Sequence, residues 1–146
     1  MKKLSIAKYC LFLFAIVCSK NSLAQNPVNW TSKELTKPSD LAATLKANKD
    51  VPVIFSVGPG AIIPRSIDIG MAKDEKNLAK FKEQISRLSK SANILIYCGC
   101  CPFEHCPNVR PAIALLQSMQ FTNYHLLDLP HNIKTDWIAK GYPVTK

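Results

Sequence analysis

The sequence lacks any apolar run of about 18 residues, the length that a membrane-spanning helix needs. It has no internal repeat and no low-complexity segment. Acidic residues are few, because 10 Asp and Glu stand against 19 Lys and Arg, for a formal net charge of +9. This positive excess is spread out rather than gathered in blocks, so we expect no nucleic-acid partner. Hydrophobic residues make up 47% of the 146 positions and charged residues 20%, which indicates one folded globular domain.

The N-terminus has the composition of an export signal. Two lysines directly after Met1 supply a positive start, and an apolar stretch follows over residues 9–18. A small-x-small site, Ser-Leu-Ala, then ends at Ala24. This order predicts a secretory signal peptide over residues 1–24, with cleavage after Ala24.

Removal of that signal leaves a mature domain over residues 25–146. We therefore expect an exported protein, periplasmic or secreted, with no membrane span after signal removal. Two other interpretations stay open: a buried N-terminal helix, and a lipid anchor on Cys18 in place of simple cleavage. Two of the six cysteines fall within the signal, so four remain in the mature domain.

Strands and helices alternate along the mature chain. Helical spacing or capping predicts a short helix opening at Pro38-Ser39 with Ser39 as its cap, and further helices over residues 74–90, 108–119 and 132–140. Apolar runs predict buried strands over residues 53–57, 93–97 and 124–129. Residues 25–37 are predicted to be a lead-in and residues 61–72 irregular. The alternation predicts an α/β fold with a central, mostly parallel sheet flanked by helices on both faces.

The four mature cysteines gather within nine positions: Cys98, Cys100, Cys101 and Cys106. They lie between the end of a predicted strand and the start of a predicted helix, where parallel α/β sheets bind ligands. The unpaired N–H groups of a helix start favour a thiolate over a thiol and also bind anions. Arg110, in the first helical turn, adds a fixed positive charge. We expect a sulfur nucleophile above an anion site, suited to an anionic sulfur donor or to transfer of phosphate or arsenate.

Three plainer interpretations of this loop remain open. Cysteines of an exported protein can form structural disulfides. The C-x-C-C-x4-C spacing, with His105, could hold zinc or copper(I). The cysteines could also be buried and inert. A c-type haem would need C-x-x-C-H, which is absent. We assign no metal ligand and expect no cofactor.

Several motifs of residues 93–144 occur together. The strand ends directly in a cysteine, at Tyr97-Cys98; the helix carries the pattern Ala-Leu-Leu-x-x-Met-x-Phe; and the chain closes with Asp-Trp and then Gly-Tyr-Pro-Val. Upstream, residues 53–57 supply a buried strand and residues 63–69 read Ile-Pro-Arg-Ser-Ile-Asp-Ile. Together these segments resemble the rhodanese-like domain, and the cysteine loop is similar to that of an exported subgroup of the family.

The resemblance implies a sulfurtransferase. The cysteine after the strand would attack a sulfane donor such as thiosulfate, become a persulfide, and pass the sulfur to a thiol or cyanide. Cys98 matches that cysteine by position. The loop is several residues longer than is usual in the family, and Asn108 stands where the family commonly has an arginine.

We therefore predict three catalytic residues, namely Cys98, Cys106 and Arg110, with Cys106 as a rival nucleophile or a resolving thiol. The predicted substrate-binding residues are Gly99, Cys100, Cys101, His105 and Asn108. The expected partners are a small anionic sulfur donor and a thiol acceptor. The alternatives are a dithiol/disulfide redox protein and a soft-metal-binding module on the same scaffold.

Overall fold

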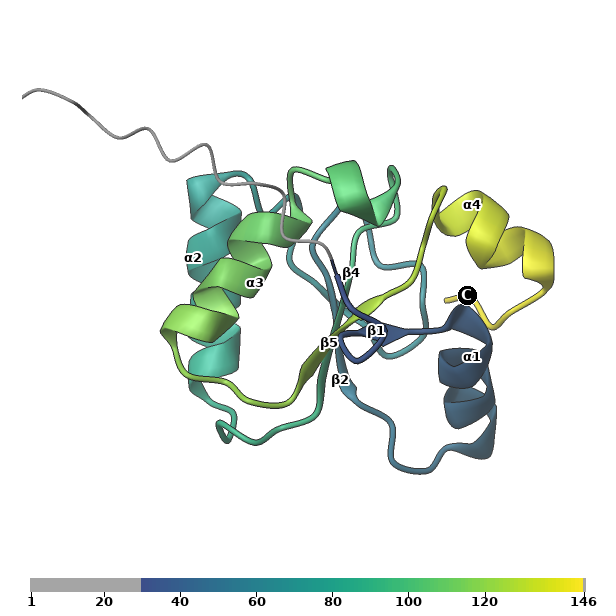
Figure 1. The fold of residues 1–146 in the computed structure, drawn as a ribbon, viewed down its shortest axis with the longest axis horizontal. Coiled ribbons are helices and arrows are strands. Elements are labelled where there is room, and N and C mark those ends of the chain that lie inside the picture. The colour runs from purple at the N-terminus through teal and green to yellow at the C-terminus, as the bar shows by residue number, and fades with distance from the viewer. Residues whose placement is uncertain (1–29, 146) are drawn as a thin grey trace, which may run out of the picture.

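A five-stranded, all-parallel sheet forms the centre of the protein (Figure 1). The computed structural model describes residues 30–145, so the predicted signal peptide lies outside the described residues. The strand order is β1-β5-β4-β2-β3. The strands are β1 (Leu35–Thr36), β2 (Val53–Ser56), β3 (Ile67–Asp68), β4 (Ile94–Tyr97) and β5 (Tyr124–Leu127).

Helices cover both faces of this sheet. Figure 1 shows α2 and α3 on one side and α1 and α4 on the other. The helices are α1 (Pro38–Ala47), α2 (Glu75–Ser86), α3 (Val109–Ser118) and α4 (Ile133–Asp136). Within the described residues, none of these helices is long and apolar enough to cross a membrane. The predicted α/β architecture is confirmed, and the sheet is parallel throughout.

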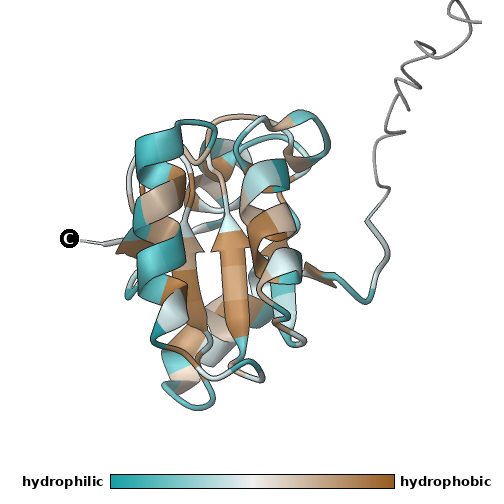
Figure 2. Cartoon of the chain, turned by 90° about the vertical axis from the view of Figure 1, so that its left-hand side faces the viewer, coloured by the Kyte–Doolittle hydropathy of each residue, from teal (hydrophilic) through white to brown (hydrophobic). Residues whose placement is uncertain are grey.

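The core divides into two layers because successive side chains of β4 point to opposite faces of the sheet. Ile94 and Ile96 pack in the layer under α2 and α3, whereas Leu95 and Tyr97 pack in the layer under α1 and α4. All four residues of this strand are buried. Figure 2 shows the same pattern as apolar strands between helices whose outer surfaces are hydrophilic. Cys98 continues this alternation and packs in the layer of Ile94 and Ile96.

The strands at residues 53–57, 93–97 and 124–129 are confirmed in position, each as a four-residue strand. Strand β5 ends at Leu127, two residues earlier than predicted. The prediction that residues 25–37 and 61–72 contain no strand is wrong, because β1 lies in the first segment and β3 in the second. Each has two residues and exists by pairing, β1 with β5 and β3 with β2. Nothing in so short a run distinguishes it from a loop before its partner is known.

The helix boundaries also need correction. Pro38 is the first residue of α1 and Lys37 its cap, so the prediction that Ser39 caps this helix is wrong. Helix α2 ends at Ser86, before the predicted residue 90, with Arg87 as its C-cap. The predicted helix over residues 132–140 is two short pieces, since a 3₁₀ turn at Ile138–Lys140 follows α4.

Candidate active site at the cysteine loop

The cysteine loop runs from the carboxyl end of β4 to the start of α3. It passes through one 3₁₀ turn at Phe103–His105 and is anchored at two points. The Phe103 N–H donates to the Leu129 carbonyl at 3.3 Å, and the Ile133 N–H donates to the Gly99 carbonyl at 3.0 Å. The Phe103 side chain is buried in the core. These contacts hold the loop at the edge of the sheet where the sequence predicts the site.

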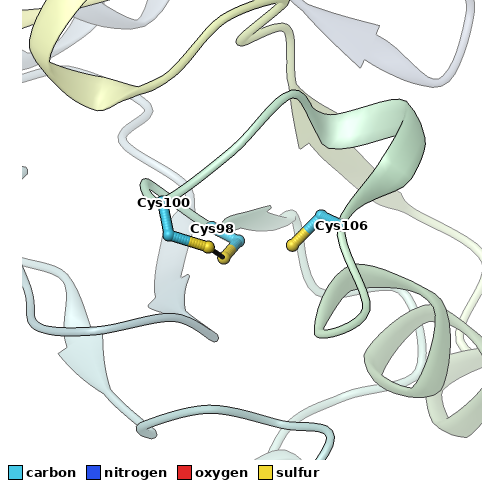
Figure 3. Close-up of side chains that lie close together, drawn as sticks. All are labelled: Cys98, Cys100 and Cys106. Atoms are coloured by element: carbon cyan, nitrogen blue, oxygen red, sulfur yellow. Dashed lines mark hydrogen bonds between the residues drawn. The ribbon is translucent and has the colours of Figure 1, made fainter.

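Three of the four cysteines bring their sulfurs together (Figure 3). The Sγ atoms of Cys98 and Cys100 lie 3.3 Å apart, and those of Cys98, Cys100 and Cys106 are all within 4.8 Å of one another. Cys101 is beside this group, with its Sγ 3.3 Å from that of Cys100. All four are free thiols. Cys98 and Cys106 are 2% and 1% exposed, whereas Cys100 is exposed to solvent.

Asn108 is the polar side chain that contacts the buried Cys98. Its Nδ2 donates to the Cys98 Sγ at 3.5 Å, and its Oδ1 accepts from the Lys73 N–H at 3.1 Å. Asn108 is itself buried. The structure thus places Asn108, predicted as a substrate-binding residue, directly against the predicted nucleophile.

The thiols differ in how readily they lose a proton. The hydrogen bond from Cys98 lowers the pKa of Cys106, burial opposes this effect, and the backbone N–H groups of Asn108 and Val109 lower it further. The hydrogen bond to Cys106 and burial both raise the pKa of Cys98. Cys106 therefore ionises before Cys98, chiefly because of the interaction between the two thiols and with a smaller contribution from the start of α3.

The thiols of Cys100 and Cys101 are less acidic than that of an ordinary cysteine. Burial raises the pKa of Cys100. Burial and a hydrogen bond to Cys100 together raise the pKa of Cys101 to about 11. Both residues come earlier in the loop than Cys106, which lies just before α3. Electrostatics in the loop thus favour thiolate character nearest the helix.

Two glycines make room for the loop. A Cβ on Gly58 would lie 2.6 Å from the Cys98 Sγ, and a Cβ on Gly99 would lie 2.8 Å from side-chain carbons of Ile133. The Gly99 contact is a packing constraint that accompanies its predicted substrate role. Gly58 follows β2, the neighbour of β4, and sequence reasoning missed it. The signal was its position, because the carboxyl ends of adjacent parallel strands lie at one edge of the sheet.

Arg110 and His105 complete the set of predicted site residues. Arg110 donates from Nη2 to the Glu104 carbonyl at 3.1 Å and so binds the loop. His105 is exposed in the 3₁₀ turn. Another histidine near this edge of the sheet, His131, follows β5, and its Nδ1 lies 3.0 Å from Asp136 Oδ1. Among the described residues, no hydrogen bond joins these three side chains to a cysteine sulfur.

No protein-family model matches the sequence, and no curated protein matches it significantly. Several solved structures do match the chain. A protein of Bacillus halodurans aligns with a TM-score of 0.56 at 23% identity, covering 75% of this chain and 74% of the other. A rhodanese-like domain from an Anabaena species gives 0.54 at 20% identity, covering 77% and 78%. The chain has a rhodanese-like fold.

A third structure with this fold is described as a single-domain sulfurtransferase of Saccharomyces cerevisiae. Its TM-score is 0.54 at 16% identity, and the alignment covers 77% of this chain and 95% of the yeast protein. The resemblance drawn from the sequence is thus confirmed for the fold of the rhodanese-like domain. The exported subgroup with a cysteine-rich loop stays a prediction.

Proposed function

We propose that this rhodanese-like domain is a thiol-dependent sulfurtransferase that forms a persulfide on Cys98. Cys106, the thiol that ionises first, takes the proton of Cys98, and the resulting Cys98 thiolate attacks the outer sulfur of a small anionic donor such as thiosulfate. A new S–S bond forms, and sulfite leaves with the electron pair of the bond that breaks. A thiolate acceptor then attacks the outer sulfur of the persulfide, takes it, and returns Cys98 as a thiolate.

The position of the Cys98 sulfur carries this proposal. Cys98 directly follows the central strand β4, and its side chain is fixed in a packed core. A nucleophile on a rigid support reacts faster, because a misplacement of about 1 Å costs roughly a hundredfold in rate. The fold supports the proposal too, since one structural neighbour is described as a sulfurtransferase.

Groups around Cys98 suit the negative charge of a persulfide. The Asn108 amide donates to the Cys98 sulfur at 3.5 Å. Arg110 supplies the positive charge that we assign to the donor's anionic end. Its bond to the Glu104 carbonyl uses one N–H of the guanidinium, which has several more to offer. In this proposal the loop residues Gly99, Cys101 and His105 bound the substrate.

The proposal is tested by mass spectrometry of the reduced protein after incubation with thiosulfate. The wild-type chain should gain the mass of one sulfur atom, and Cys98→Ser should gain none. Cys100→Ser and Cys101→Ser remove neighbouring loop thiols, and they should only reduce the amount of the adduct. If the adduct persists in Cys98→Ser and vanishes in Cys106→Ser, Cys106 is the nucleophile. If no variant and no wild-type protein forms it, the domain is not a thiosulfate-dependent sulfurtransferase.

A second candidate function is dithiol/disulfide exchange, which the 3.3 Å contact between the Cys98 and Cys100 sulfurs favours. An external disulfide would take up two electrons and two protons as these thiols join. Counting of free thiols before and after exposure to oxidised glutathione tests it. A reversible loss of two thiols without persulfide formation supports redox exchange over sulfur transfer.

We also propose that the domain acts outside the cytoplasm, as a periplasmic or secreted protein. The support is the charged start, short apolar run and small-x-small site of residues 1–24. N-terminal sequencing of the protein from its native cells should begin near Gln25. A chain that keeps Met1 and stays in the cytoplasm would show this proposal to be wrong.

A further inference from the structure

The three clustered sulfurs have nearly the spacing of a metal–thiolate centre. Thiolates that share one ion at about 2.3 Å lie roughly 3.8 to 4.0 Å from each other. Here the Cys98 and Cys100 sulfurs are 3.3 Å apart, and all pairs among Cys98, Cys100 and Cys106 are within 4.8 Å. The 3.8 to 4.0 Å that a shared ion requires lies between 3.3 Å and 4.8 Å. Changes of less than about 1 Å in the sulfur spacings would therefore place all three on one ion.

The backbone holds two of the sulfurs and leaves the third accessible. Cys98 directly follows the central strand β4, Cys106 lies three residues before the start of α3, and both are buried. Cys100 is exposed on the loop between them. Figure 3 shows the three side chains directed toward a common space. An ion could thus reach Cys100 from solvent and pass to a preformed buried pair.

The surroundings of the cluster suit sulfur anions. The Cys98 sulfur accepts a hydrogen bond from the Asn108 amide at 3.5 Å, and Cys106 lies just before the N-terminus of α3, where unpaired N–H groups favour anions. Such outer hydrogen bonds orient metal ligands and offset their charge. Among the described residues, the cluster includes no carboxylate and no imidazole. An all-sulfur ligand set selects a soft ion over Mg²⁺, Ca²⁺ or Mn²⁺.

The number of sulfurs distinguishes between the soft ions. Structural zinc sites are closed by four protein ligands. Cys101 approaches Cys100 but is not part of the group whose sulfurs are all within 4.8 Å. We propose that Cys98, Cys100 and Cys106 form a three-sulfur binding site for monovalent copper. The ion binds as Cu(I) without change of oxidation state, and each thiol that ligates it releases its proton to solvent.

The test is a titration of reduced, metal-free protein with Cu(I) under anaerobic conditions, against a chromogenic Cu(I) chelator. One Cu(I) per chain should bind. Cys98→Ser, Cys100→Ser and Cys106→Ser should each weaken binding by more than the roughly 10- to 100-fold that loss of an outer hydrogen bond costs. Cys101→Ser is the control and should bind like the wild-type chain. Circular dichroism identifies any variant that fails to fold.

X-ray absorption of the copper-loaded wild-type protein needs no variant, and it should show three sulfur neighbours and no nitrogen or oxygen. Wild-type affinity in Cys100→Ser would overturn the proposal. So would zinc binding that is tighter than copper binding and depends on Cys101. The inference does not rest on sulfur transfer. Wild-type protein that binds one Cu(I) but forms no thiosulfate adduct would support the copper site and contradict the proposed function, and the reverse result would do the opposite.

Discussion

Asn108 connects the sulfur of Cys98 to the backbone of Lys73. Its Oδ1 accepts the Lys73 N–H at 3.1 Å, so its Nδ2 is the end that faces the Cys98 sulfur at 3.5 Å. The amide is buried and both ends are in use. This fixed orientation presents a hydrogen-bond donor, never an acceptor, to the sulfur. Charge that develops on Cys98 is stabilised without reorganisation of the side chain.

We expect Asn108→Asp to slow persulfide formation by about 100-fold, since loss of one preorganised donor to an anion costs that much or more. The carboxylate can still accept the Lys73 N–H, but it places negative charge against the sulfur. The measurement is the rate of adduct formation with thiosulfate. Asn123→Asp is the control, because Asn123 is a surface amide that donates to the Ser91 carbonyl. Equal rates in Asn108→Asp and the wild-type chain would remove Asn108 from the site.

Two glycines after β2 should respond differently to alanine. A Cβ on Gly58 would lie 2.6 Å from the Cys98 sulfur, so Gly58→Ala must displace that sulfur and reduce sulfur transfer. Gly60 has nothing within 4 Å of the added atom but has φ +87°. Gly60→Ala should therefore cost about 1–2 kcal/mol in unfolding free energy and leave the activity of the folded protein unchanged. Chemical denaturation and the adduct assay, run on both variants, separate the two effects.

The central strands were predictable because their signal is local. The runs at β2 and β4 are buried on both faces, so each is apolar at nearly every position. Strands β1 and β3 were not predictable, because two residues carry no period and become strands only beside β5 and β2. The end of α4 at Asp136 was also not predictable from local spacing. Residues 132–140 have helical spacing, but Trp137 turns into the core at φ −125° and interrupts the helix.

The candidate site could be located but not resolved from the sequence. Four cysteines within nine positions, between a strand and a helix, placed the loop at the correct edge of the sheet. Which sulfurs come together depends on the path of the loop. Hydrogen bonds to Leu129 and Ile133, which are distant in the sequence, determine that path. The role of Gly58 depends on strand order in the same way. Only the pairing of β2 with β4 brings it to the Cys98 sulfur.

Asp136 should make stability depend on pH near the acid limit. Burial opposes its ionisation, but hydrogen bonds from the His131 N–H, the His131 ring and the Asn132 N–H outweigh burial and lower the pKa of Asp136. A carboxyl with a lowered folded pKa stabilises the fold above its unfolded pKa of about 3.9, and this contribution is lost as the pH falls through the folded value.

Asp136→Asn should therefore reduce the unfolding free energy by about 1.5–3 kcal/mol at neutral pH, the range for hydrogen bonds to a charged group. The difference from the wild-type chain should shrink below about pH 3.9. Urea denaturation across this pH range measures it. Asp74→Asn is the control, since Asp74 precedes α2 without a side-chain capping bond. A difference that stays constant with pH would show that the Asp136 charge contributes nothing.

Arg110 should contribute to donor binding more than to the fold. Arg110 is a half-buried residue in the first turn of α3, where the helix dipole also favours anions, and one N–H of its guanidinium already bonds the Glu104 carbonyl. We expect Arg110→Ala to raise the KM for thiosulfate about tenfold, which corresponds to roughly 1.4 kcal/mol of lost binding. The unfolding free energy should change by only about 0.5 kcal/mol. The KM increase should be smaller at high salt, because screening already weakens the wild-type attraction.

Arg87→Ala provides the matched control, because Arg87 is an exposed arginine paired with Glu83 on α2. If Arg110→Ala and Arg87→Ala have the same KM, the guanidinium of Arg110 only fastens the loop.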